Sequence, residues 1–134
     1  MTHYTAGAYG ELEQVLQTEP LDYVQLNYSV VEREAERRLL PLAVDRGLAV
    51  LVNRPFAEGA LFRRVKGKPL PPFAAEVDCT SWAQLFLKWI VAHPAVTCVI
   101  PATSRPEHLE DNMQAGTGPL PDAALRDRIA ALVD

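Results

Sequence analysis

Apolar residues along this chain recur with two periods, one typical of helices and the other typical of strands. The strongest helical pattern lies at residues 81–93, where the spacing i, i+3, i+4, i+7, i+8 is apolar, and Pro94 ends it. Within a second pattern, Pro41 predicts a kink or a short break, and Gly47 predicts a C-terminal cap. In all, the sequence predicts helices at residues 9–17, 32–46, 81–93, 105–114 and 121–133.

Three stretches between these helices predict strands. Residues 22–29 alternate, with Tyr23, Gln25 and Asn27 on one face and Val24, Leu26 and Tyr28 on the other. Residues 48–52 and 96–100 are apolar without alternation, which predicts strands that are buried on both faces. Because helices separate the strands, we expect an α/β protein of parallel βαβ units with right-handed crossovers.

Three parallel strands are too few for a closed barrel, and each outer strand would keep unpaired backbone groups. We therefore expect the chain to be part of a longer protein or to complete its sheet with a second copy. The second alternative predicts a homodimer, because a two-fold interface needs only one self-complementary surface. The strand at residues 22–28 or the strand at 96–100 would lie at the dimer interface.

Composition narrows the class of protein. With 134 residues, of which 49% are hydrophobic and 22% charged, residues 1–134 predict one globular unit. A net charge of −4 argues against nucleic acid or an anionic membrane as partner. We find no apolar run of membrane-spanning length, no signal peptide and no zinc-ligand spacing. Cys79 and Cys98 predict reduced core or near-core thiols, and hence a cytoplasmic protein.

Two loops carry candidate chemistry. After the strand at 96–100, Thr103 and Ser104 precede a helix that starts near Arg105, and such a loop suits an anionic phosphate. An ordinary βα loop would look the same. Residues 54–77 form a long connection that carries Arg63, Arg64, Lys66 and Lys68, and it is either a solvated basic loop or a flap over a pyrophosphate.

Five features in a fixed order make the chain resemble the C-terminal half of an aldo-keto reductase. They are the strand Gln25-x-Asn27-Tyr28-Ser29, the leucine-rich helix that ends at Arg46-Gly47, the turn Arg54-Pro55-Phe56-x-x-Gly59, the helix Ala83-Gln84-x-x-Leu87-x-Trp89, and the segment from Ile100-Pro101 to Asn112. The resemblance implies a partial (half) TIM barrel, in which the three strands correspond to the sixth, seventh and eighth strands of the family. In such barrels, ligands bind at the carboxyl ends of the strands.

The resemblance also implies a nicotinamide cofactor, with NADPH expected and NADH left open. It assigns binding of the nicotinamide end to Thr2, His3 and Gln25. It also assigns cofactor contacts to the turn after the strand at 48–52, at Asn53, Arg54, Pro55 and Phe56. It assigns the adenosine 2′-phosphate to Thr103, Ser104 and Arg105, with His108 nearby, and adenine to Asp111 and Asn112.

Three departures from the family pattern weaken these assignments. Asn53 stands where many members carry an aromatic ring, Ala102 where some have a lysine, and His108 where they have an arginine. Arg105 can compensate, since a guanidinium forms paired hydrogen bonds with a phosphate. His108 alone is equally consistent with an exposed helix histidine.

No residue of this chain matches the family's catalytic tyrosine, lysine, aspartate or histidine, so we expect no catalytic residue here. Three hypotheses follow: the cofactor-binding half of an NADPH-dependent carbonyl reductase, a non-catalytic half-barrel that self-assembles as a nucleotide-binding or structural protein, or a phosphate-binding module of an unrelated barrel such as an isomerase or aldolase. The ordered family matches favour the first two.

Overall fold

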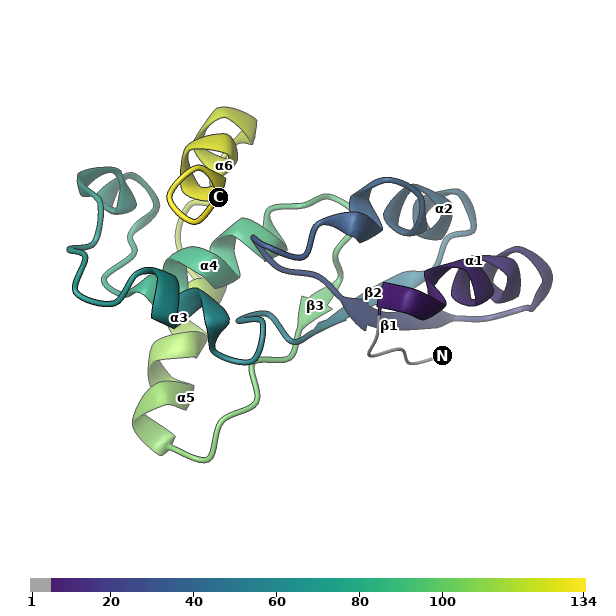
Figure 1. Ribbon diagram of the computed structural model, residues 1–134, viewed down its shortest axis with the longest axis horizontal. Helices are drawn as coiled ribbons and strands as arrows, with labels where there is room; N and C mark the ends of the chain where they lie inside the picture. Colours follow the sequence, from purple (N-terminus) through teal and green to yellow (C-terminus); the bar gives the residue numbers. More distant parts are fainter. Residues whose placement is uncertain (1–5) are drawn as a thin grey trace.

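A parallel sheet of three strands forms the centre of the molecule (Figure 1). The computed structural model describes residues 6–134. The strands are β1 (Tyr23–Asn27), β2 (Ala49–Asn53) and β3 (Cys98–Val99), in the order β1-β2-β3. Asn27 pairs with Asn53, and Leu51 pairs with Cys98, so the carboxyl ends of the strands lie at one edge of the sheet. The predicted parallel βα architecture is confirmed.

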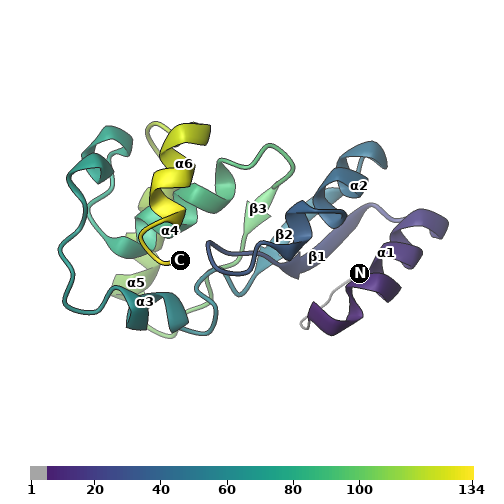
Figure 2. The ribbon, with the colours of Figure 1, turned by 45° about the horizontal axis from the view of Figure 1, so that its top comes forward.

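Each predicted helix is present, and one further short helix follows β2. The α-helices are α1 (Tyr9–Thr18), α2 (Leu39–Asp45), α3 (Ala60–Arg64), α4 (Trp82–Val91), α5 (Pro106–Met113) and α6 (Ala123–Ala130). Single 3-10 turns cover Ala6–Ala8, Glu34–Glu36, Pro72–Val77 and Gln114–Gly116. Figures 1 and 2 place α1 and α2 at the β1 end of the molecule, with α3, α4, α5 and α6 at the other end.

One face of the sheet packs against the helices, and the opposite face does not. Val24, Leu26, Val50 and Val52 are fully buried and join the core with the apolar residues of α2 and α4. On the other face, Gln25, Ala49 and Leu51 are half-buried and Tyr23 is 48% exposed, whereas Asn27 and Asn53 at the carboxyl ends of the strands are buried. The prediction that 48–52 and 96–100 are buried on both faces is therefore wrong, because helices cover only one side.

The two cysteines differ in exposure. Both thiols are free; Cys79 is buried, as predicted, but Cys98 is exposed on β3. The expectation of a near-core position for Cys98 is wrong, because β3 is only two residues long and Cys98 is exposed on it.

The predicted helix at 32–46 is divided into a 3-10 turn at Glu34–Glu36 and the helix α2. Pro41 lies in the first turn of α2, where a missing backbone N–H leaves no hydrogen bond unmade. Gly47 ends the helix with φ +68°. Its N–H donates to the Val44 carbonyl at 3.0 Å, and the Leu48 N–H donates to the Ala43 carbonyl at 2.8 Å. These two bonds form a Schellman cap, as the glycine predicted.

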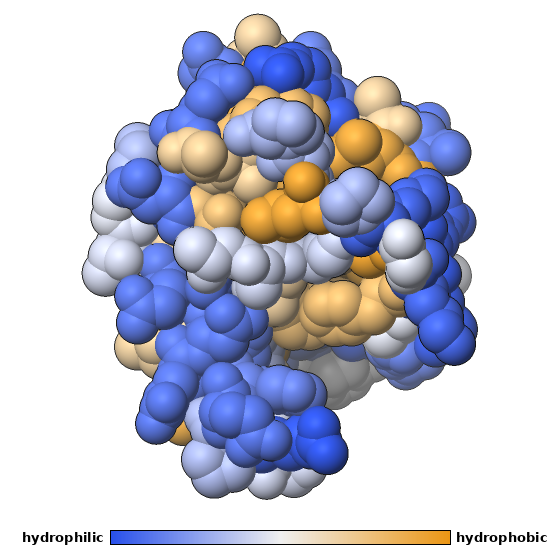
Figure 3. Space-filling model, turned by 90° about the vertical axis from the view of Figure 1, so that its left-hand side faces the viewer, coloured by the Kyte–Doolittle hydropathy of each residue, from blue (hydrophilic) through white to orange (hydrophobic). Residues whose placement is uncertain are grey.

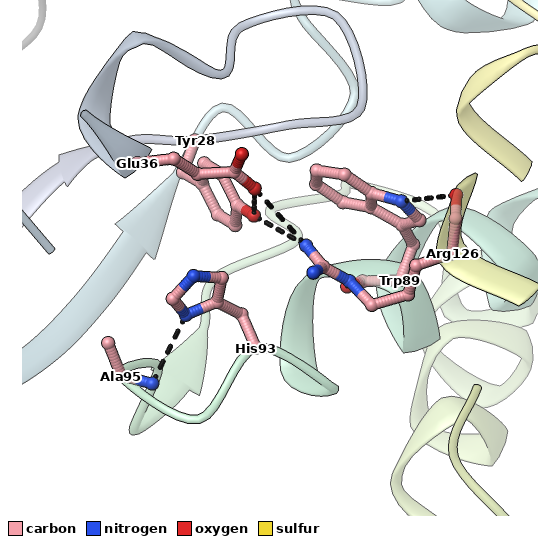
Figure 4. A network of polar contacts seen from close by, with 6 residues as sticks. All are labelled: Tyr28, Glu36, Trp89, His93, Ala95 and Arg126. Carbon is pink, nitrogen blue, oxygen red and sulfur yellow. Dashed lines mark hydrogen bonds and ion pairs between the residues drawn. The ribbon is translucent and has the colours of Figure 1, made fainter. Parts of the chain in front are cut away.

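A buried polar network fastens α6 to the core (Figure 4). Arg126 donates to the Tyr28 hydroxyl at 2.7 Å and to the Glu36 carboxylate at 3.3 Å, and the Tyr28 hydroxyl donates to Glu36. The Arg126 guanidinium also lies 4.3 Å from the ring centroid of Trp89. Burial, followed by the hydrogen bond to Glu36, raises the pKa of Tyr28. The network thus joins the end of β1, the 3-10 turn before α2, α4 and α6.

Candidate functional site

Two adjoining cavities lie at the carboxyl ends of the strands. The first, which we call the strand-end cavity, has a volume of about 470 Å³ and is lined by Gln25, Asn53, Arg54, Pro55, Phe56, Glu58, Gly59, Ile100, Pro101 and Ala102. The second, which we call the helix cavity, has a volume of about 390 Å³ and is lined by Phe56, Phe62, Ser81, Trp82, Ala83, Ala102, Thr103, His108, Asp111 and Asn112. Phe56 and Ala102 line both cavities, so the two form neighbouring parts of one elongated site.

Most of the predicted cofactor-binding residues lie on these walls. Those that do are Gln25, Asn53, Arg54, Pro55, Phe56, Thr103, His108, Asp111 and Asn112. Ser104 and Arg105 line neither cavity. Thr2 and His3 lie outside the described residues. The fold therefore brings together side chains that are up to 87 positions apart along the chain, from Gln25 to Asn112.

The loop after β3 leads directly into α5. The Thr103 hydroxyl accepts the Arg105 N–H at 3.2 Å, and α5 begins at Pro106. The Arg105 side chain is 65% exposed and lies 3.7 Å from the Glu107 carboxylate. An anion at this loop would meet an accessible guanidinium whose present partner is a solvated surface carboxylate.

The turn after β2 has an unusual backbone. Arg54, Ala57 and Glu58 have φ values of 51°, 48° and 53°, a region that side-chain-bearing residues rarely adopt. The Arg54 guanidinium lies 3.5 Å from the Glu58 carboxylate and 3.8 Å from that of Glu32. Strained backbone of this kind concentrates at functional sites, where the surrounding structure holds it in place.

The rest of the 54–77 segment is folded. It contains α3 and the 3-10 helix Pro72–Val77. Arg64 donates to the Val133 carbonyl, whereas Lys66 and Lys68 are exposed. The Trp82 indole N–H donates to the Lys68 carbonyl at 3.3 Å and so joins this segment to the helix cavity.

An aromatic cluster lines part of the helix cavity, and the sequence pattern alone did not assign it to the site. The ring centroids of Phe56 and Phe62 are 4.8 Å apart, and Trp82 stacks on Phe86 at 5.6 Å. Helical spacing identified Trp82 as a core residue, but it is only half-buried and faces the cavity. On this end of the molecule, apolar surface lies in the middle and polar side chains surround it (Figure 3).

Hydrogen bonds between α4 and α5 hold the wall opposite this cluster. The Ser81 hydroxyl donates to one oxygen of the Asp111 carboxylate at 2.7 Å, and the Gln84 amide donates to the other at 2.6 Å. Asn112 beside them is 7% exposed. Asp111 and Asn112, the predicted adenine-binding pair, are thus held firmly at the cavity wall.

Comparison with known proteins identifies the family. A model of the Aldo/keto reductase family matches residues 8–132. The NADH-specific methylglyoxal reductase of Escherichia coli (strain K12) is 26% identical over 138 residues, which cover 84% of this chain and 42% of that protein. An uncharacterized oxidoreductase of Schizosaccharomyces pombe is 30% identical over 105 residues, which cover 78% of this chain and 33% of that protein. The chain therefore spans less than half the length of these relatives.

Solved structures show the same fold. An aldo/keto reductase from Klebsiella pneumoniae, solved in complex with NADP and acetate, matches 98% of this chain and 46% of its own length, with 21% identity and a TM-score of 0.73. The holo form of an aldo-keto reductase from Bacillus halodurans matches 99% of this chain and 49% of its own length, with a TM-score of 0.69.

These matches confirm the predicted half-barrel. Within residues 6–134, no helix is long and apolar enough to cross a membrane. The family model covers nearly the whole described chain, and the strands and helices lie in the order that the sequence predicted. The chain belongs to the aldo/keto reductase family.

Proposed function

We propose that this chain forms the cofactor-binding half of an NADPH-dependent carbonyl reductase. The observation that carries the proposal is the pair of adjoining cavities at the carboxyl ends of three parallel strands, lined by residues that the family motifs assign to a nicotinamide nucleotide. This is the position at which barrels of this type bind their ligands. The Klebsiella pneumoniae relative was solved with NADP, which supports a nucleotide of this class.

The two cavities suit the two ends of such a nucleotide. In the strand-end cavity, the amides of Gln25 and Asn53 supply donors and acceptors for a carboxamide. At the helix cavity, Thr103 and the nearby Arg105 suit a 2′-phosphate, which distinguishes NADPH from NADH. The Escherichia coli relative is NADH-specific, whereas an aldo-keto reductase from Klebsiella pneumoniae was solved with NADPH, so both nucleotides occur among similar proteins. We propose that Arg105 favours NADPH in this chain.

Carbonyl reduction also needs a proton donor, and Tyr9 and Tyr28 are poorly suited to this role. Tyr9 donates to the Asn27 carbonyl at 3.2 Å, and burial raises the pKa of its hydroxyl. Tyr28 is fully buried in the Arg126 network. A catalytic tyrosine instead needs a lowered pKa, which a lysine neighbour provides in this family. We therefore propose that reduction requires the other half of the barrel.

NADPH titration followed by tryptophan fluorescence tests the cofactor proposal, since Trp82 lines the helix cavity. We expect saturable binding that weakens at least about tenfold in Arg105→Ala, because a charge-assisted hydrogen bond is lost. Arg37→Ala is the matched control, since Arg37 is 77% exposed and pairs only with the neighbouring Glu34 among the salt bridges of the described chain. Equal binding by wild type and Arg105→Ala would contradict the proposed phosphate site.

A turnover assay separates the reductase from the non-catalytic alternative. The chain alone should not oxidise NADPH with any aldehyde above background. Oxidation that rises in proportion to the concentration of purified chain would refute this expectation. Nucleotide binding without turnover, even after a first barrel half is added, would favour the non-catalytic half-barrel.

For the non-catalytic alternative, we propose that a second copy of the chain completes the barrel. Within residues 6–134, β1 and β3 each pair with only one strand. Beside β3, Ile100 is 41% exposed, and Leu109 and Met113 form a stripe on α5 with exposures of 52% and 66%. Apolar stripes beside an open strand edge are typical of surfaces that a partner covers.

Light scattering coupled to gel filtration tests this assembly. We expect a mass near twice 14.8 kDa for wild type and a shift towards monomer for Met113→Lys. Val44→Lys is the matched control, because Val44 is a 60% exposed apolar residue on α2, at the other end of the molecule. A mass near 14.8 kDa that persists at high concentration would refute the homodimer and favour a separate first half.

A further inference from the structure

Asp111 is held by two side chains from the first turn of α4. Ser81 is the N-cap of that helix, and its hydroxyl oxygen accepts the Gln84 N–H at 3.1 Å. The same hydroxyl donates its proton to Asp111 at 2.7 Å, while the Gln84 side-chain amide donates to the second carboxylate oxygen at 2.6 Å. Both carboxylate oxygens are therefore fixed, and with them the plane of the group.

Hydrogen bonds to the side-chain carbonyl oxygen of Gln84 determine the orientation of its amide. Its carbonyl oxygen accepts the Thr80 backbone N–H at 2.9 Å and the Thr80 hydroxyl at 3.3 Å. The nitrogen must then be the atom that faces Asp111, because the two amide positions are not interchangeable when one accepts a backbone N–H. Gln84 is only 3% exposed, so this side chain is buried with both ends hydrogen-bonded.

Asp111 nevertheless keeps acceptor capacity for a ligand. An ionised carboxylate offers about four lone-pair sites, and Ser81 and Gln84 occupy one on each oxygen. Asp111 lines the helix cavity together with the apolar side chains of Phe62 and Trp82. A carboxylate beside apolar surface forms stronger hydrogen bonds than one in water, and a fixed carboxylate needs no reorganisation when a donor arrives.

We propose that Ser81 and Gln84 are positioning residues that fix the Asp111 carboxylate as the acceptor for an exocyclic amino group of the purine base. Contact between Asp111 and adenine is what the family resemblance implies, and the roles of Ser81 and Gln84 in orienting the carboxylate are added to it here. The inference rests on the proposed nucleotide function and deepens it. It also gives a role to Gln84, which the helix motif contains but which the cofactor assignment leaves without a function.

The test compares NADPH with reduced nicotinamide hypoxanthine dinucleotide phosphate, which has a carbonyl oxygen in place of the amino group. Against wild type, the hypoxanthine form should bind at least about tenfold more weakly, because its oxygen would meet a fixed carboxylate. In Gln84→Leu and in Ser81→Ala, this ratio should fall to about threefold or less, since a carboxylate that is free to turn discriminates less.

Controls separate positioning from general stability. Ser81→Thr keeps the hydroxyl and should restore the wild-type ratio. Asp122→Ala removes the cap of α6, where Asp122 accepts the Leu125 N–H at 2.8 Å, and should leave the ratio unchanged. If Gln84→Leu does not fold, the comparison of Ser81→Ala with Ser81→Thr tests the positioning role alone. Ser81→Ala should still fold, because one helix cap contributes only a small part of the total stability.

The outcomes distinguish the two proposals. Saturable binding with the same base selectivity in wild type, Gln84→Leu and Ser81→Ala would overturn the positioning inference and leave the cofactor site standing. No saturable binding of either dinucleotide by wild type would overturn the proposed function, and the inference with it.

Discussion

Replacing the buried lysine of α4 tests how the C-terminal part of the chain is held. Lys88 is completely buried, yet its charge has no carboxylate within 4.0 Å in the described chain. Its ammonium instead donates to three backbone carbonyls, those of Val77 and Thr117 at 2.6 Å and that of Pro119 at 3.1 Å. These bonds use all three protons of the ammonium and join α4 to the segments before and after it.

The expected cost of Lys88→Met follows from these contacts. Methionine has nearly the same length, so the change removes the donors without opening a large cavity. It leaves three carbonyls without their donor, and each buried unsatisfied group costs about 1–3 kcal/mol. Loss of the charge avoids the cost of desolvating the ammonium, and the loop that contains Thr117 can partly relax towards water. We therefore expect a loss of about 3–5 kcal/mol in the free energy of unfolding.

Urea denaturation monitored by circular dichroism measures this loss through the midpoint and slope. Lys68→Met is the control, because Lys68 is exposed and its change should cost less than about 0.5 kcal/mol. A loss below about 1 kcal/mol for Lys88→Met, with an unchanged slope, would refute the reasoning. It would mean that water or another donor replaces the ammonium at these carbonyls.

Three further outcomes follow from other contacts. Gly118→Ala should lower the free energy of unfolding by about 1–3 kcal/mol in the same denaturation assay. Gly118 has φ +73°, and a Cβ there would lie 2.8 Å from a carboxylate oxygen of Asp78. An unchanged free energy of unfolding would contradict this prediction. Burial, and then a nearby arginine, lowers the pKa of His93, so stability should be full above the ordinary value of 6.5 and fall as the pH drops towards the folded pKa. His93→Gln should flatten this decline between pH 7 and 4, and an equally steep decline would exclude His93 as its source. A thiol reagent should modify Cys98 rapidly and Cys79 slowly in the native chain, because only Cys98 is exposed and burial raises the pKa of Cys79; equal rates on mass spectrometry would refute this.

Local sequence patterns determined most of the secondary structure. The apolar spacing of 81–93 and the stop at Pro94 predicted α4, and Gly47 predicted the cap of α2. Helix periodicity and capping depend on residues within about four positions of one another, so they can be read from the sequence alone. The family motifs, met in order along the chain, predicted the half-barrel and half of the residues on the cavity walls.

Only the tertiary structure decided which side chains bind one another. The Asp111 carboxylate is held from 27 and 30 positions away, and Arg126 reaches Tyr28 across 98 positions. Such contacts depend on how the elements pack. The sequence around a serine, a glutamine or a lysine is the same whether its side chain is exposed to solvent or buried and hydrogen-bonded. For the same reason, the apolar run at 96–100 could not reveal that helices cover one face of the sheet and leave the other open.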